Sequence, residues 1–76
     1  MIKEHERVVL ISPVPSEALE AGDVGTVVHI YSDRKAYEVE FVTLSGKTAA
    51  VVTVDSSEVR PVGAREIPHA RELVVK

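Results

Sequence analysis

The chain has 76 residues, which is enough for one domain with one small hydrophobic core. It has no cysteine, which excludes a disulfide framework, a thiolate zinc site and a cysteine nucleophile. Its net charge of −3 argues against nucleic acid as the main partner, because binding to phosphate backbones normally needs a basic surplus. The charged amino terminus and the short apolar runs predict no signal peptide and no membrane-spanning helix, so we expect a cytoplasmic protein.

The first predicted element is a short strand over residues 7–12, which is apolar on both faces and rich in β-branched side chains. Pro13 and Pro15 end it, because neither residue can donate to a sheet ladder. Residues 16–21 offer a serine cap, early acidic side chains and a glycine just beyond the end. This pattern predicts a single helical turn within a long loop.

The predicted central strand covers residues 24–31 and follows the entry turn Gly22-Asp23-Val24-Gly25. Both of its faces are largely apolar, which is typical of a bent strand that contributes to two packed sheets. Gly25 would permit either a sharp bend or a close approach of another backbone. Of the three histidines, His29 on this strand is the one that we expect to be partly buried.

A hairpin turn over residues 32–35 precedes the strand at 36–42, which has the strongest period-two alternation in the chain. The side chains predicted to face inward are Tyr37, Val39 and Phe41, and those predicted to face water are Glu38 and Glu40. Tyr31, at the end of the preceding strand, is then the one aromatic residue left for stacking at the surface.

A second hairpin turn over residues 43–47 leads to a strand at 48–54. A cap and a single 3₁₀ turn at 55–58 and a short edge strand at 59–62 complete the series. Five short strands with one long first loop predict an all-β fold, a small five-stranded SH3-like barrel over residues 1–62.

The remaining residues, 63–76, form a predicted C-terminal extension. With Pro68 at the first helical position it could be a short helix, whereas its β-branched end favours a sixth strand. In either form the apolar residues of this tail would dock on the barrel or on a second subunit, so the tail is where we would expect a homo-oligomer to form.

No motif predicts catalysis. His5, His29 and His69 lack the short spacing of metal ligands, and none of the six serines stands in a nucleophile elbow. The sequence Gly46-Lys47-Thr48 matches only the end of a phosphate-binding loop, and it precedes a strand rather than a helix. We therefore expect no enzymatic activity, no cofactor and no metal site.

The sequence favours instead a protein-interaction module whose partner is another protein, for which a basic surface would be complementary. Docking would use an exposed strand edge or the long first loop. The candidate partner-binding residues are acidic ones in that loop and on the outer strand face, and apolar ones in the tail: Glu17, Glu20, Asp23, Glu38, Glu40, Leu73 and Val75. A solvated strand face predicts the same acidic pattern, and this alternative stays open.

The segments at 7–10, 21–28, 36–41 and 59–61, together with 66–71 in the tail, resemble a family of short bacterial proteins catalogued as a domain of unknown function. The resemblance implies a small accessory protein, of a kind sometimes suspected to be the partner of a neighbouring protein, as in toxin–antitoxin pairs.

At the level of fold, the rhythm of glycine, valine and phenylalanine is similar to the KOW motif of ribosomal and transcription factors. It is also similar to the SH3-like photosystem I accessory subunit and to the beta-chain barrel of nitrile hydratase. These proteins have unrelated roles, so the likeness of fold does not choose a function. An RNA-binding KOW-like module is the alternative function, and the low number of basic side chains argues against it.

Overall fold

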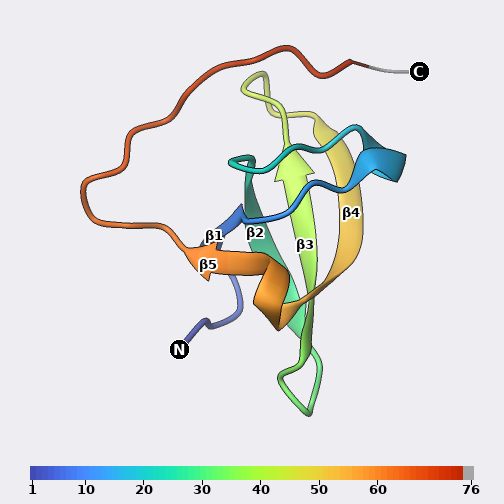
Figure 1. Ribbon diagram of the computed structural model, residues 1–76, viewed down its shortest axis with the longest axis vertical. Helices are drawn as coiled ribbons and strands as arrows, with labels where there is room; N and C mark the ends of the chain where they lie inside the picture. The colour runs from blue at the N-terminus through green and yellow to red at the C-terminus, as the bar shows by residue number, and fades with distance from the viewer. Residues whose placement is uncertain (75–76) are drawn as a thin grey trace.

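The computed structural model describes residues 1–74 and is all-β (Figure 1). One antiparallel sheet has the strand order β4-β3-β2-β1-β5. Its strands are β1 (Arg7–Leu10), β2 (Val24–Ile30), β3 (Ala36–Val42), β4 (Thr48–Asp55) and β5 (Val59–Pro61). Two 3₁₀ turns complete the elements, η1 (Pro15–Glu17) in the first loop and η2 (Ser56–Glu58) before β5. All five predicted strands are confirmed, and their ends differ from prediction by two residues or fewer.

The sheet is not closed into a barrel within the described residues. β4 and β5 are its two edges, and the paired strands are β4 with β3, β3 with β2, β2 with β1 and β1 with β5. Closure would require the second edge of β5 to pair with β4, and within the described residues β5, three residues long, pairs with β1 alone. The sheet therefore curves around one core while keeping two separate edges (Figure 1).

The core lies on the concave side of the curved sheet. Its most deeply buried side chains are Val8, Leu10, Val27 and Val39. The inward direction predicted for Tyr37, Val39 and Phe41 is confirmed, because all three are buried. Every buried hydrophobic residue of the described chain lies between Ile2 and Val59, so the tail supplies none of them.

The bend of β2 comes from a β-bulge between Val27 and His29 rather than from Gly25. A bulge inserts one residue and reverses which face the following side chains take. His29 consequently points outward with 53% of its side chain exposed, so its predicted partial burial is wrong. Gly25 serves the other predicted role, because a Cβ there would lie only 2.5 Å from Cγ1 of Val39.

Residues 62–74 form neither helix nor strand and contain one turn at Ala64 and Arg65. The predicted strand or short helix is therefore absent from the described part of the tail. Side-chain ion pairs hold this segment in place of a backbone ladder, and Pro68 has no N–H to donate. The tail leaves β5, swings out and returns across the far end of the sheet (Figure 1). No helix within residues 1–74 is long and apolar enough to cross a membrane.

Candidate functional site

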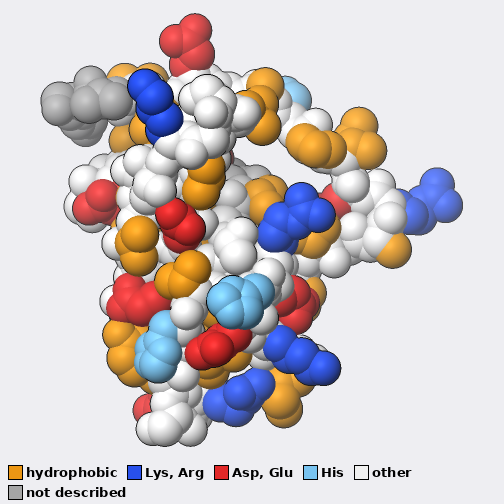
Figure 2. Space-filling model, turned by 180° about the vertical axis from the view of Figure 1, so that it is seen from behind, with side chains coloured by type: hydrophobic (Ala, Val, Ile, Leu, Met, Phe, Trp, Pro, Cys, Tyr) orange, Lys and Arg blue, Asp and Glu red, His pale blue; other side chains and the backbone are white. Residues whose placement is uncertain are grey.

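A groove of about 740 Å³ lies between the sheet and the returning tail. Figure 2 shows the tail standing off the body of the molecule, with apolar side chains along it. The apolar lining comes from β1, β2, β3, the first loop and the tail, and includes Val9, Leu19, Val24, Phe41, Val42, Ile67 and Leu73. The groove thus joins segments that lie far apart in the sequence.

The first loop is fixed so that Asp23 stands beside this groove. Leu19 is buried and bridges to Val14, which closes the loop around η1. The Glu20 N–H donates to Oδ2 of Asp23 at 2.8 Å, and the Asp23 C=O accepts from the Leu10 N–H at 2.9 Å. Because both the backbone and the carboxylate of Asp23 are held, the acidic group has one fixed position.

Arg71 of the tail occupies this acidic position. Its Nε donates to Oδ1 of Asp23 at 2.9 Å and its Nη2 donates to Oδ2, which is the two-pronged pairing that guanidinium and carboxylate groups favour. Nη2 also donates to the Ala18 carbonyl at 3.1 Å, and Glu20 Oε1 lies 3.7 Å from Nε. The tail is therefore tied to the first loop by one arginine.

The charge of Asp23 is stabilised by these contacts. Partial burial would raise the pKa of its carboxyl group, but hydrogen bonds from the Arg71 guanidinium and the Glu20 N–H outweigh that effect. The pKa of Asp23 therefore lies below its ordinary value. The side chains of Asp23 and Arg71 are 19% and 26% exposed, so the pair is shielded from water more than an ordinary surface ion pair.

A second ion pair fixes the other end of the tail. Arg60 donates from Nη1 to Oε1 of Glu66 at 2.8 Å and from Nη2 to Oε2 at 2.6 Å, and the Gly63 N–H donates to Oε1 at 2.6 Å. The Arg60 guanidinium, followed by the Gly63 N–H, lowers the pKa of Glu66 to about 2. Between the two anchors Ile67 is 86% exposed. Residues 66–71 thus form a strap that an ion pair holds at each end.

The structure brings only some of the predicted partner-binding residues together. Asp23, Glu40 and Leu73 line the groove, and Glu20 lies beside Arg71 at its margin. Glu17 is exposed at the end of η1, whereas Glu38 lies on the outer face of β3. Val75 lies outside the described residues. Glu38 and Glu40 share the outer face of β3, but only Glu40 lines the groove, so the structure gathers only part of the predicted acidic residues there.

Glu38 belongs to a small polar cluster on the outer face of the sheet. Its Oε2 accepts from the Tyr31 hydroxyl at 2.6 Å and from the Thr53 hydroxyl at 2.7 Å. The Tyr31 hydrogen bond lowers the pKa of Glu38, and the same bond raises the pKa of Tyr31. The ring of His29 meets the ring of Tyr31 edge-on at 4.8 Å. Tyr31 is predicted as an exposed stacking residue. Its hydroxyl group donates to Glu38 and its ring contacts the ring of His29.

A family model described as a domain of unknown function, DUF4926, matches residues 4–61. The chain belongs to the DUF4926 family. The matched residues run from before β1 to the end of β5. The strands and first loop that line the groove therefore belong to the DUF4926 domain, whereas the tail that covers the groove lies outside it. A search of curated proteins and a search of solved structures each gave no significant match.

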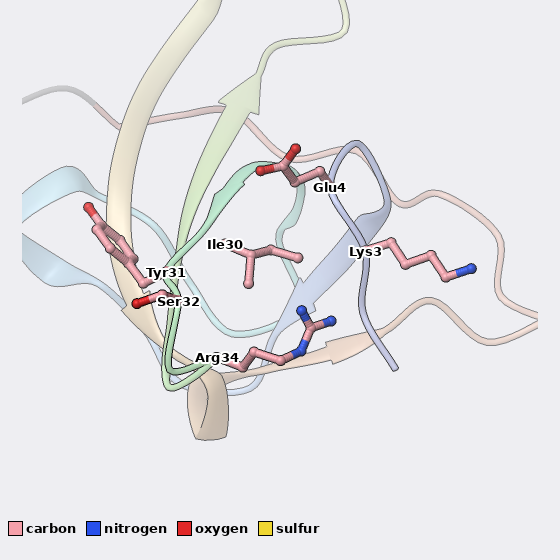
Figure 3. A pocket seen from close by; sticks show the side chains of 6 residues that line it. All are labelled: Lys3, Glu4, Ile30, Tyr31, Ser32 and Arg34. Carbon is pink, nitrogen blue, oxygen red and sulfur yellow. The ribbon is translucent and has the colours of Figure 1, made fainter.

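A second hollow of about 420 Å³ lies at the other end of the DUF4926 domain, beside the β2–β3 hairpin (Figure 3). In Figure 3 Arg34 reaches toward the amino-terminal segment, where its Nη2 donates to the Ile2 carbonyl at 3.0 Å, while Lys3 points away. These side chains do not converge on one point. Among residues 1–74 no group of three histidine, aspartate or glutamate side chains could hold a metal ion.

The residue that defines the candidate site is Arg71, and the sequence carries no signal for its pairing. Asp23 and Arg71 are 48 positions apart, and no motif joins them. The sequence did single out Asp23 as acidic and Leu73 as apolar. Their meeting at one groove depends on the path of the tail, which no local pattern in residues 63–74 encodes.

Proposed function

We propose that this chain is a non-enzymatic protein-interaction module that binds an extended, arginine-bearing segment of a partner protein in the groove above Asp23. The observation that carries the proposal is the bidentate pair of hydrogen bonds from the Arg71 guanidinium to the Asp23 carboxylate. A fixed carboxylate that accepts two parallel guanidinium bonds selects arginine over lysine, because only the guanidinium group is planar and forked.

The surroundings of Asp23 support a peptide as the ligand. The groove combines apolar side chains with charged ones that include Arg7, Asp23 and Glu40. A largely apolar site with a few placed polar groups is the usual form of a recognition site, in which the polar groups fix the position of the ligand. The net charge of −3 favours a basic partner by steering the encounter. In this proposal the tail is a built-in occupant, and a partner arginine competes with Arg71 for the same carboxylate.

We also propose that the domain is an open barrel of the SH3-like kind. The connectivity supports this: a long loop follows the first strand, two hairpins join the next strands, and a 3₁₀ turn precedes the last. The first strand lies between β2 and β5, which links both halves of the curved sheet. The long first loop then carries the recognition residue Asp23.

The proposal is tested with a labelled peptide that has the sequence of residues 66–73 and blocked ends, titrated into the full chain. Arg71→Gln opens the site, so this variant should bind the peptide at least about ten-fold more tightly than the wild type, whose affinity is reduced by the fraction of closed molecules. Arg65→Gln removes an arginine from the same tail without touching Asp23, and it should behave as the wild type.

A second peptide, with glutamine in place of its arginine, shows whether the arginine is recognised. It should bind the Arg71→Gln chain far more weakly, and Asp23→Asn in that chain should abolish the difference between the two peptides. Equal binding of both peptides by the Arg71→Gln chain, or binding of neither, would overturn the proposal.

A further inference from the structure

The two edges of the sheet are protected to very different degrees against pairing with another chain. β5 has three residues and ends at Pro61, and its Arg60 is engaged by Glu66. β4 has eight residues, no proline and no charged side chain before Asp55. Long edges without charge or proline are the ones on which strand pairing occurs. β4, at the right in Figure 1, is therefore the less protected of the two sheet edges within residues 1–74.

The backbone of β4 presents free hydrogen-bonding groups along that edge. Opposed residues of an antiparallel pair alternate between bonded and non-bonded, and the Ser56 N–H donates to the opposed Lys35 carbonyl at 2.9 Å. Every second residue before Ser56 is then also hydrogen-bonded to β3, so Val54 pairs with Tyr37 and Val52 pairs with Val39 through their backbone groups. The N–H and C=O groups of Val51 and Thr53 therefore point outward, and within residues 1–74 no backbone hydrogen bond ties them to another segment.

The side chains of β4 suit a partner that is identical to itself. Ala50 and Val54 are buried in the core, whereas Val51 and Thr53 face outward and Val51 is 55% exposed. The exposed middle of the strand is thus uncharged, with an apolar residue at Val51 and a hydroxyl group at Thr53 that donates to Glu38. The charges stand at its two ends and are opposite, with Lys47 before the strand and Asp55 at its last residue.

We propose that β4 pairs antiparallel with β4 of a second copy about a two-fold axis at Val51, so that two sheets become one continuous sheet. The two-fold axis places the exposed faces of the two sheets on the same side of the joined sheet. It also places Val51 of one copy directly opposite Val51 of the other. It also brings the Lys47 end of each strand to the Asp55 end of its neighbour, and such opposite-charge pairs stabilise adjoining strands. A parallel arrangement would place like charges together at both ends.

The test is the mass of the full chain in solution, measured by light scattering and sedimentation over a range of concentrations up to about 1 mM. The wild type should approach twice the chain mass of 8.3 kDa as the concentration rises. Val51→Lys should raise the dimer dissociation constant at least about ten-fold, because two like charges then face each other across the axis. Ile11→Lys is the matched control, since Ile11 is 51% exposed, β-branched and outside β4.

A mixture of Val51→Lys and Val51→Glu chains should restore the dimer, because the charges at the axis are then opposite. If Val51→Lys fails to fold by circular dichroism, Lys47→Glu in the hairpin turn replaces it and should weaken the dimer by opposing Asp55. A wild type that keeps the chain mass throughout overturns the proposal, as does a dimer that Val51→Lys and Ile11→Lys weaken equally. A dimer lost only on removal of the tail would also overturn it, because the interface would then be the tail.

Discussion

Gly25 shows how a single residue sets the spacing between strands. A Cβ at this position would lie 2.5 Å from Cγ1 of Val39 and 3.0 Å from the carbonyl oxygen of Glu40, so β2 and β3 can approach only because the side chain is absent. We expect Gly25→Ala to lower the free energy of unfolding by about 1–3 kcal/mol through overpacking. Urea denaturation measures this.

Gly63→Ala is the matched control for this substitution. The three atoms nearest to a Cβ at Gly63 all belong to the Glu66 side chain, the closest at 3.2 Å, and no positive φ is required there. The two variants differ in the neighbours of the added methyl group. Equal unfolding midpoints for both would show that the contact with Val39 does not limit the packing of the sheet.

Glu66 makes the upstream anchor of the strap dependent on pH. Its pKa falls from an ordinary value of 4.5 to about 2 in the folded chain, chiefly because of Arg60 and then the Gly63 N–H. A carboxyl group whose folded pKa is lowered stabilises the fold above its unfolded pKa, and this contribution is lost as the pH falls through the folded pKa. We therefore expect the anchor to be complete above pH 4.5 and to open as the pH approaches 2.

The measurement is the amide chemical shift of Gly63, which reports on the hydrogen bond to Glu66 during an acid titration. Glu66→Gln should remove the transition, because the neutral amide does not titrate. A midpoint near 4.5 in the wild type would mean that Arg60 does not hold the carboxylate in solution.

At the level of single residues the alternation of apolar and polar side chains predicted burial where the strand was regular. Tyr37, Val39 and Phe41 on β3 are buried as expected, because β3 keeps an unbroken period of two over that stretch. The predicted partial burial of His29 is wrong because the bulge after Val27 shifts the period. A bulge is a property of the pairing between two strands, so one strand's sequence does not reveal it.

Among the elements, the two ends of the chain contribute differently to stability. Ile2 is buried, whereas no residue of the described tail is. We expect a chain that ends at Gly63 to keep its sheet and to unfold cooperatively near the wild-type midpoint, since only the two strap anchors are lost. Circular dichroism during urea denaturation measures both properties.

Ile2→Ala provides the contrast within the same experiment. Removing most of a buried isoleucine side chain costs about 2–5 kcal/mol, so the amino-terminal variant should be clearly destabilised while the shortened chain is not. Non-cooperative unfolding of the shortened chain would mean that the strap holds the sheet together.

The strands and turns were predictable from local sequence, and the tail was not. The strands end within two residues of their predicted bounds, and the 3₁₀ turn at η2 follows Asp55, which forms a capping box with Glu58. The sequence of the tail predicts a short helix from the position of Pro68 or a sixth strand from its β-branched end. Its conformation is fixed instead by ion pairs with Arg60 and Asp23, which are remote partners that local propensity does not include.

For the whole molecule, the distribution of charge matters more than the number of charges. Basic side chains are scattered over the face seen in Figure 2, and Arg34, Arg60 and Arg71 are engaged within the chain. With a net charge of −3, we expect no saturable binding of a short single-stranded RNA even at low ionic strength. Fluorescence anisotropy of a labelled RNA, titrated at two salt concentrations, measures this.

A binding curve that weakens with added salt would instead support the RNA-binding alternative. The Arg71→Gln and Arg65→Gln chains serve as paired variants in that case. Each removes one positive charge from the tail, so they should reduce a general electrostatic affinity equally.

The sequence by itself determined the strands, the turns, the core residues of β3 and the lack of a catalytic motif, because these depend on neighbours within a few positions. Only the tertiary structure decided that Asp23 and Arg71 meet over a groove and that no strand of residues 1–74 covers the outer edge of β4. Both features arise from contacts between remote segments. Such contacts depend on how the strands are ordered and on where the tail returns, and one chain's local pattern of side chains leaves that order open.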